Sequence, residues 1–232
     1  MVTATGYCMK IGTSEFVYNL TFRLEPIVSR ENYIYGYELL TEIYSEYEGG
    51  IINPGVFFNT LSLEMCAKVL NVQIGKVNIL KKNINKPISL NLNERLLILL
   101  VEDHELLSSI HMLRNILRVE ISEEIDLKKN LKFLMKLRRF APLWLDDFGG
   151  GDITIQKKYL KLFEVVKIDR VFLKNILEFK YGVKLIDEII CNLHMENIDV
   201  ICEGVENITE LKTYYKHDFE AYQGWFWKSR VI

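Results

Sequence analysis

The chain reads Leu143-Trp144-Leu145-Asp146-Asp147-Phe148-Gly149-Gly150-Gly151 past its middle, a short apolar run that ends in two adjacent carboxylates and then breaks into glycines. An apolar run followed by turn residues is typical of a buried strand that enters a loop. Neighbouring aspartates repel each other in a partly buried site, and a divalent cation removes that repulsion. Taken alone, such a pair is more often a solvated turn than a metal site. Polar residues at the ends of other apolar runs distinguish the two interpretations.

Runs typical of strands and runs with helical spacing alternate along the rest of the chain. Strands are expected at residues 16–28, 33–43, 87–92, 117–122, 143–147, 163–169, 199–204 and 219–223. Helices are expected at residues 57–71, continuing towards 82, and at 94–101, 105–115, 127–140, 154–161, 181–195 and 209–216. Eight strands separated mostly by helices in 232 residues predict an α/β fold, a (β/α)8 TIM-like barrel. Alternation alone also allows a doubly wound open sheet.

Composition and charge argue against DNA binding and against association with a membrane. The formal net charge of −2 gives no electrostatic basis for binding DNA. No apolar segment approaches membrane-spanning length, and the first residues lack the features of a signal peptide, so no membrane association is expected. The four cysteines are scattered without paired spacing, which predicts reduced thiols and a cytoplasmic protein. No linker or repeat divides the chain, and one domain is the simplest organisation.

Polar residues stand at or near the ends of the expected strands. In a (β/α)8 barrel the carboxyl ends of the strands share one face, where active sites are built. The residues concerned are Glu38, Asn91, Glu120, Asp146, Asp147, Lys167, Asp169, Glu203, Glu206 and Gln223. Each alone could be a helix cap, a turn former or a solvated side chain. Together they predict a binuclear metal site, and oxygen ligands without His or Cys favour Mg²⁺ or Mn²⁺ over Zn²⁺.

Short motifs in these segments follow one another in a specific order. They are Glu38-Leu39-Leu40, Ser89-Leu90-Asn91-Leu92-Asn93, Val119-Glu120-Ile121-Ser122-Glu123, Asp146-Asp147-Phe148-Gly149, Lys167-Ile168-Asp169-Arg170, Glu203-Gly204-Val205-Glu206 and Gln223-Gly224. From about residue 22 to residue 229, this order resembles the EAL domain, a family of bacterial phosphodiesterases that hydrolyse cyclic di-GMP. The first motif stands where the family has its Glu-Ala-Leu signature. The chain looks most like the small stand-alone enterobacterial members that control motility and fimbriae.

The resemblance implies a ligand set for two ions of Mg²⁺ or Mn²⁺. One ion would be held by Glu38, Asn91, Glu120 and Asp146. Asp146 would bridge to a second ion, held also by Asp147 and, directly or through water, by Glu203. The ions would share the attacking hydroxide, and the expected product from cyclic di-GMP is linear 5′-pGpG.

The resemblance also implies roles for residues around the ions. Lys167 would orient or deprotonate the attacking water, because a lysine near metal ions can have a lowered pKa and act as a base. Gln223 would position the same water, while Glu206 and Asp169 would support these groups. Glu123 would tie down the loop at residues 149–156, beside which the family dimerises, so a homodimer is expected.

Four features depart from the family pattern. Glu25 stands where the family commonly has Gln, and Glu42 stands where it has an Arg that contacts substrate phosphate. An anion near a bound phosphate should weaken binding by about 1–3 kcal/mol if it is desolvated. Asp152 replaces an apolar residue in the glycine loop. The domain is expected to cover residues 1–232, with residues 1–15 as an N-terminal extension and a final helix that is short or missing.

These residues are compatible with three classes of function. An active cyclic di-GMP phosphodiesterase is favoured, because every metal-ligand position and the lysine are present. The alternative is a catalytically inactive EAL-type regulator that binds a protein partner or cyclic di-GMP without cleaving it, a class suggested by Glu25, Glu42 and the short C-terminus. A barrel hydrolase for another phosphodiester rests on fold analogy alone.

Overall fold

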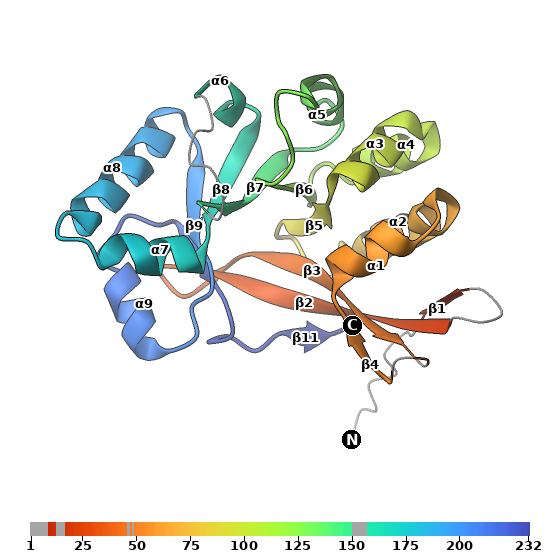
Figure 1. Ribbon diagram of the computed structural model, residues 1–232, viewed down its shortest axis with the longest axis horizontal. Helices are drawn as coiled ribbons and strands as arrows, with labels where there is room; N and C mark the ends of the chain where they lie inside the picture. The colour runs from red at the N-terminus through yellow and green to blue at the C-terminus, as the bar shows by residue number, and fades with distance from the viewer. Residues whose placement is uncertain (1–8, 13–16, 46, 48, 150–156) are drawn as a thin grey trace.

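The computed structural model describes residues 9–12, 17–45, 47, 49–149 and 157–232. Its strands form a closed eight-stranded barrel with helices packed around the outside (Figure 1), which confirms the expected fold and excludes the open sheet. The barrel strands are β2 (Val17–Ser29), β3 (Ile34–Ser45), β5 (Ile88–Leu92), β6 (Leu117–Ser122), β7 (Leu143–Phe148), β8 (Phe163–Ile168), β9 (Asp199–Cys202) and β10 (Ala221–Gln223).

The helices follow the predicted order with two differences. They are α1 (Pro54–Thr60), α2 (Leu63–Leu80), α3 (Glu94–Glu102), α4 (His104–His111), α5 (Leu131–Leu137), α6 (Lys157–Leu160), α7 (Arg170–Leu177), α8 (Gly182–Met195) and α9 (Ile208–Tyr214). The single helix expected from residue 57 towards 82 is broken in two, because the Ser62 side chain caps a new helix by accepting a hydrogen bond from the Met65 amide. Helix α7 was not predicted from the sequence. Its first turn is capped by the Asp169 side chain, which accepts a hydrogen bond from the Phe172 amide.

One strand runs against the others, unlike in an all-parallel (β/α)8 barrel. Strands β3 and β5 to β10 run parallel to one another around the barrel, whereas β2 pairs antiparallel with both β3 and β10. Only residues 30–33 connect β2 to β3, and so short a connection can join antiparallel strands but not parallel ones. The barrel therefore closes through a hairpin instead of a helical crossover.

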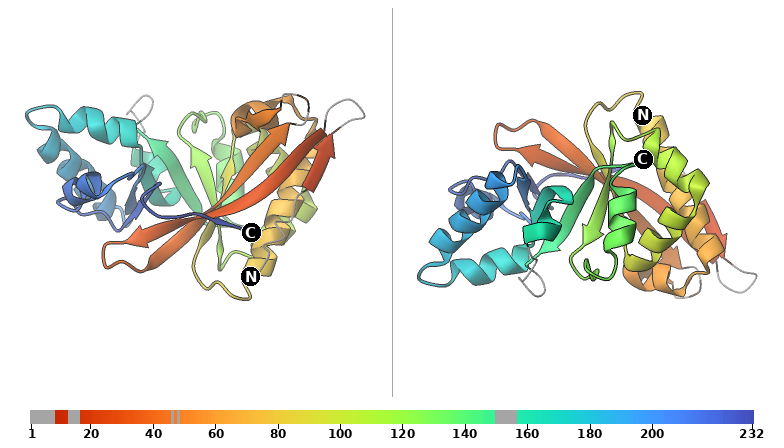
Figure 2. Two further views of the ribbon diagram at one scale, coloured as in Figure 1. Left: turned by 90° about the horizontal axis from the view of Figure 1, so that it is seen from below. Right: turned by 90° about the horizontal axis from the view of Figure 1, so that it is seen from above.

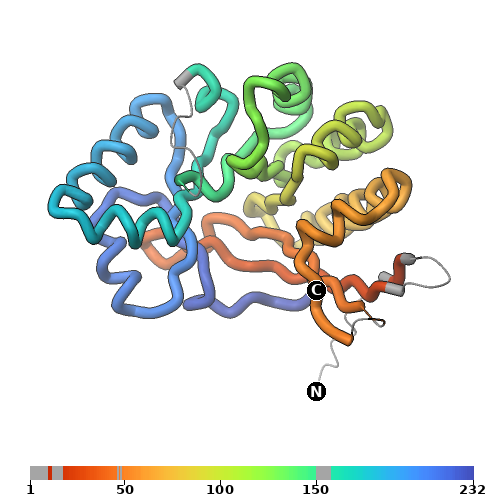
Figure 3. The backbone as a smooth tube through the Cα atoms, viewed as in Figure 1, coloured from red at the N-terminus to blue at the C-terminus, as the bar shows by residue number. Residues whose placement is uncertain are grey.

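The β2–β3 hairpin extends beyond the barrel. Figure 2 shows the long strands leaving the barrel on one side, where the short strands β1 (Met9–Gly12) and β4 (Gly50–Ile52) pair with β2 and β3. Residues 224–232 contain no helix and end in β11 (Arg230–Val231), which runs along β2 (Figure 3).

Two layers of side chains fill the barrel. The lower layer is apolar and consists of Ile27, Trp144, Val165, Ile201 and Ala221. Because side chains two positions apart on a strand point to the same face, the next inward-facing residues are Glu25, Asp146, Lys167, Glu203 and Gln223. The second, upper layer is polar, and its acidic residues with Glu38 and Glu120 are called the carboxylate layer below. It lies towards the carboxyl ends of the parallel strands, where (β/α)8 barrels build their active sites.

No helix in the described part of the chain is both long enough and apolar enough to cross a lipid bilayer.

Candidate active site in the upper barrel layer

Lys167 is the centre of the polar layer. Its side chain is fully buried at 0% exposure and its Nζ contacts four carboxylates. Nζ lies 2.7 Å from Glu203 Oε1, 2.8 Å from Asp146 Oδ1, 3.2 Å from Glu120 Oε2 and 3.3 Å from Glu38 Oε2. Three of these carboxylates lie on strands β3, β6 and β7, and Glu203 directly follows β9. Residues far apart in the sequence therefore meet at a single ammonium group.

The same carboxylates decide the protonation of Lys167. Burial alone lowers the pKa of this lysine, but the nearby charges of Asp146, Glu120, Glu203 and Glu38 outweigh burial and raise the pKa well above its ordinary value. Lys167 is therefore a cation among these residues. The lowered pKa expected for Lys167 beside bound metal ions, and with it a role as a base, stays a prediction, because the raised pKa describes the protein groups alone.

Among the described residues, Glu38 accepts hydrogen bonds from more donors than any other carboxylate of the layer. It accepts hydrogen bonds from the Asn91 amide and the Gln223 amide as well as from Lys167. Burial raises the pKa of Glu38, but the Lys167 charge and these hydrogen bonds hold it below its ordinary value. The Gln223 Nε2 also donates to Glu25 Oε1 at 3.1 Å, which adds Glu25 to the polar layer.

The surroundings of Glu120 and Glu203 within the protein disfavour the charged forms of both carboxyls. Burial, together with the neighbouring charge of Glu38 at Glu120 and of Asp146 at Glu203, raises the pKa of each carboxyl well above its ordinary value. Glu120 Oε1 is buried and has no hydrogen-bond partner among the described residues. An unpaired buried carboxylate oxygen is costly unless a cation binds it, so this oxygen fits a metal ligand.

A β-bulge brings Asp146 and Asp147 to the same site. In a regular strand their side chains would point to opposite faces, but the pairing of β7 with β8 gains an extra residue between Leu145 and Phe148. Asp147 occupies the bulge with φ of 58°, a left-handed conformation that Asp tolerates. Ligand oxygens of Asp146, Asp147 and Glu203 consequently lie within 4.8 Å of one another.

Asp147 shows the electrostatic consequence of that proximity. Burial, then the adjacent charge of Asp146, raises the pKa of Asp147 to about 6. Oxygen ligands at this spacing suit a hard divalent cation, which would stabilise the charged form of all three carboxylates. The structure thus brings together every residue that the sequence assigned to the two ions: Glu38, Asn91, Glu120, Asp146, Asp147 and Glu203.

The three residues expected to support the site, Glu123, Asp169 and Glu206, each make a contact with a nearby part of the structure. Glu123 Oε2 accepts from the Gly149 amide at 2.9 Å, so it fixes the end of β7; the rest of the glycine loop, residues 150–156, lies outside the described residues. Asp169 caps α7 by accepting from the Phe172 amide at 2.9 Å. Glu206 forms an ion pair with Arg170, and the described contacts of its carboxylate are with that residue and not with the carboxylate layer.

One residue on the hairpin, Arg23, was not assigned to the site from the sequence alone. Arg23 lies on β2 two residues before Glu25, and its Nη1 pairs with Glu42 Oε1 at 2.7 Å. The available signal was the alternation of β2, which places residues 23, 25 and 27 on one face.

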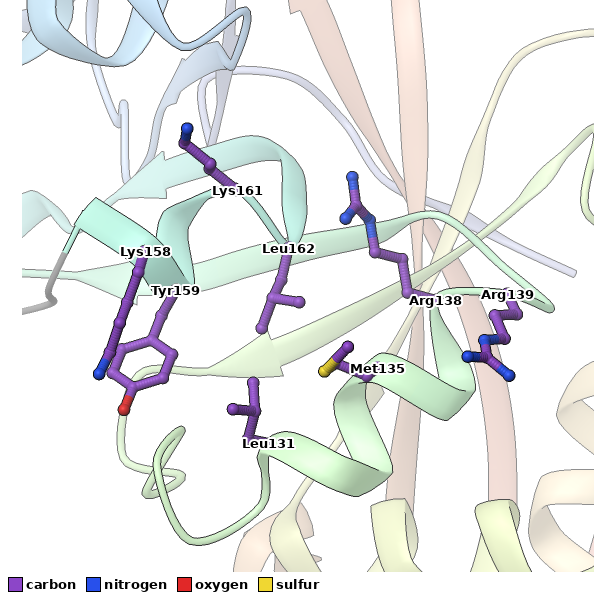
Figure 4. A pocket seen from close by; sticks show the side chains of 8 residues that line it. All are labelled: Leu131, Met135, Arg138, Arg139, Lys158, Tyr159, Lys161 and Leu162. Carbon is purple, nitrogen blue, oxygen red and sulfur yellow. The ribbon is translucent and has the colours of Figure 1, made fainter.

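A separate surface pocket lies outside the barrel between α5 and α6. Figure 4 shows its lining residues: Leu131, Met135, Arg138, Arg139, Lys158, Tyr159, Lys161 and Leu162. None of these residues belongs to the carboxylate layer, so the pocket is not the candidate active site.

Substituting Gly149 with alanine is expected to lower stability by about 1–3 kcal/mol, through overpacking and a strained backbone. Gly149 has φ of 100°, and a Cβ there would lie 2.3 Å from Cγ of the buried Phe172 ring. The hydrogen bond to Glu123 would be strained as well. The measurement is urea unfolding followed by circular dichroism.

Gly75 is the matched control for that substitution, because a Cβ at this position in α2 meets nothing within 4 Å. Gly75→Ala is expected to raise stability by up to about 1 kcal/mol through helix propensity. Equal effects of the two substitutions would contradict the packing argument at Gly149.

Comparisons with known proteins agree with this geometry. A family model described as the EAL domain matches residues 17–229. Cyclic di-GMP phosphodiesterase PdeH of Escherichia coli K12 is 31% identical over 138 residues, which are 60% of this chain and 53% of PdeH, so the chain spans about half the length of that relative.

Solved structures show the same architecture. The crystal structure of the EAL-like domain protein YdiV superposes with a TM-score of 0.80 at 21% identity, covering 92% of this chain and 93% of YdiV. The Klebsiella pneumoniae BlrP1 structure, a complex with manganese and cyclic di-GMP, superposes with a TM-score of 0.69 at 20% identity, covering 92% of this chain and 56% of BlrP1. At these identities the structural matches establish the fold.

Proposed function

The chain belongs to the EAL domain family, and from this we propose that it is a metal-dependent phosphodiesterase that hydrolyses cyclic di-GMP to linear 5′-pGpG. The observation that carries the proposal is the buried layer in which Glu38, Glu120, Asp146 and Glu203 surround a single lysine. The name of PdeH and the manganese and cyclic di-GMP complex of BlrP1 support the substrate and the class of metal ion.

Two ions of Mg²⁺ or Mn²⁺ fit the residues present. Glu38, Asn91, Glu120 and Asp146 would hold one ion, and Asp146, Asp147 and Glu203 the other; the unpaired Glu120 Oε1 supports this fit. When bound, such a pair of ions polarises a phosphate and supplies a hydroxide nucleophile at neutral pH.

The protein groups beside the ions orient the reactants. Lys167 is fully buried beside these carboxylates, so its Nζ would direct the attacking water, and its charged form would also stabilise negative charge on the phosphate oxygens. Gln223 donates through Nε2 to Glu25 and Glu38, which leaves its buried Oε1 without a partner among the described residues. That oxygen would accept a hydrogen bond from the attacking water.

Incubation of the purified protein with cyclic di-GMP tests this proposal. Reactions contain Mg²⁺, Mn²⁺ or EDTA, and the products are resolved by chromatography. We expect 5′-pGpG with either metal ion and none with EDTA. Cleavage of other cyclic or linear dinucleotides in preference to cyclic di-GMP would contradict the proposed substrate.

The alternative function is an inactive EAL-type regulator that binds cyclic di-GMP or a protein partner. The observation that favours it is Glu42, an anion on the inward face of β3 beyond Glu38. Tight binding of cyclic di-GMP without product would support this alternative. The homodimer and the cytoplasmic location remain predictions, which sedimentation and cell fractionation would test.

A further inference from the structure

The upper barrel layer has too little positive charge for its proposed substrate. Its carboxylates outnumber its cations, since Lys167 is the one basic residue in contact with them among the described residues. A cyclic dinucleotide carries a negative charge on each of two phosphates. Metal ions would offset the carboxylates, but a phosphate towards the mouth of the barrel needs a further donor from the protein.

Arg23 lies on the strand face that leads from the carboxylates to the mouth. Ile27 belongs to the lower layer inside the barrel, and Glu25 contacts Gln223 in the upper layer. Alternation places Arg23 on the same face, about 7 Å further along β2. Its register partner is Leu40, two residues beyond Glu38 in the direction of the carboxyl end of β3.

The guanidinium of Arg23 is held in place but only partly used. Nη1 pairs with Glu42 Oε1 at 2.7 Å, and the two side chains are 31% and 37% exposed. Nε is shielded from solvent and has no hydrogen-bond partner among the described residues. A guanidinium presents a planar fork of donors that matches two phosphate oxygens, and the Nε of this fork has no acceptor among the described residues.

We propose that Arg23 binds a phosphate of the dinucleotide through the Nε edge of its guanidinium, and that Glu42 holds the opposite edge. Arg23 thereby supplies the phosphate-binding cation that Glu42, an anion, does not. This inference rests on the proposed function for its ligand. It assigns substrate affinity to a residue on β2 that does not contact the metal-binding carboxylates in the described structure.

The test compares Arg23→Ala with the unaltered chain. Initial rates of 5′-pGpG release across cyclic di-GMP concentrations give KM and kcat, and a fluorescent cyclic di-GMP gives Kd in EDTA. We expect KM and Kd to rise about tenfold or more, with kcat unchanged. Arg23→Lys, which keeps the charge but loses the planar fork, should recover part of the affinity.

Two further variants separate phosphate binding from a structural role of the ion pair. Glu42→Ala breaks the same pair but keeps the guanidinium and removes an anion, so KM should rise clearly less than in Arg23→Ala. Arg30→Ala removes an exposed cation that follows β2 at its other end, where Arg30 lies 3.8 Å from Asp218, and should change neither constant. Thermal unfolding confirms that each variant is folded.

The outcomes distinguish this inference from the proposed function. Binding by the unaltered chain with the same Kd in Arg23→Ala overturns the role of Arg23 alone, as does an equal loss of affinity in Glu42→Ala. Binding without cleavage, weakened by Arg23→Ala, supports Arg23 while contradicting the proposed hydrolysis. If the unaltered chain neither binds nor cleaves cyclic di-GMP, the proposed function and the role of Arg23 are both overturned.

Discussion

Glu38→Ala is expected to reduce kcat/KM for cyclic di-GMP by about a thousandfold or more, equivalent to about 4 kcal/mol of transition-state stabilisation. Glu38 is a proposed metal ligand and also the common acceptor for Asn91, Gln223 and Lys167. Alanine would remove a ligand and leave these donors without their acceptor. The measurement is the rate of 5′-pGpG release in saturating Mn²⁺, with circular dichroism to confirm the fold.

Glu25→Gln is the matched control, because Glu25 lies directly opposite Glu38 on the hairpin and accepts from the same Gln223 amide. No described side-chain contact joins Glu25 to Lys167 or to the metal-binding carboxylates other than through Gln223. This variant, which restores the residue common in the family, should keep its turnover. Full activity of Glu38→Ala would refute the metal assignment.

Lys167→Ala is expected to slow hydrolysis by about 10²–10⁴-fold while metal binding is retained. The metal-free protein should lose about 3–5 kcal/mol of stability, because removing one partner of a buried ion pair leaves uncompensated charge. Four carboxylates would then face one another without the ammonium group. Added Mn²⁺ should recover much of that stability, and more than it adds to the unaltered chain.

Thermal unfolding with Mn²⁺ and with EDTA measures this difference separately from activity. Lys161→Ala removes a largely exposed lysine, 3.5 Å from Glu196, and should shift neither melting temperature nor turnover. Unchanged turnover in Lys167→Ala would remove this lysine from the mechanism. An equal effect of Mn²⁺ on both proteins would show that the ions do not bind at the carboxylate layer.

The strands and most of the site could be predicted from the sequence because both depend on local patterns. Apolar runs mark the strands, and polar residues at their ends become neighbours once the barrel closes. The antiparallel direction of β2 was missed, although the short connection at residues 30–33 implies it. The helix break at Ser62 was missed because the apolar spacing on both sides continues across the cap.

Other features depend on tertiary contacts that no local pattern contains. The positive φ of Asp147 follows from a register shift between β7 and β8. The raised pKa of Lys167 needs four carboxylates from separate parts of the chain. The pairing of Arg23 with Glu42 requires the register of two strands, and the sequence alone presents Glu42 as a substitution without a partner.

Closure of the barrel through β2 also determines when the site can assemble during folding. Gln223 reaches Glu25 across 198 positions of sequence, and β10 and β11 both pair with β2. Contacts of such high sequence separation form late, because the entropy of closing the long loop opposes them until most of the chain is ordered. A nascent chain on the ribosome therefore lacks Gln223 and the closed barrel around the carboxylates until β10 has emerged, and the proposed hydrolytic activity would report the last step of folding.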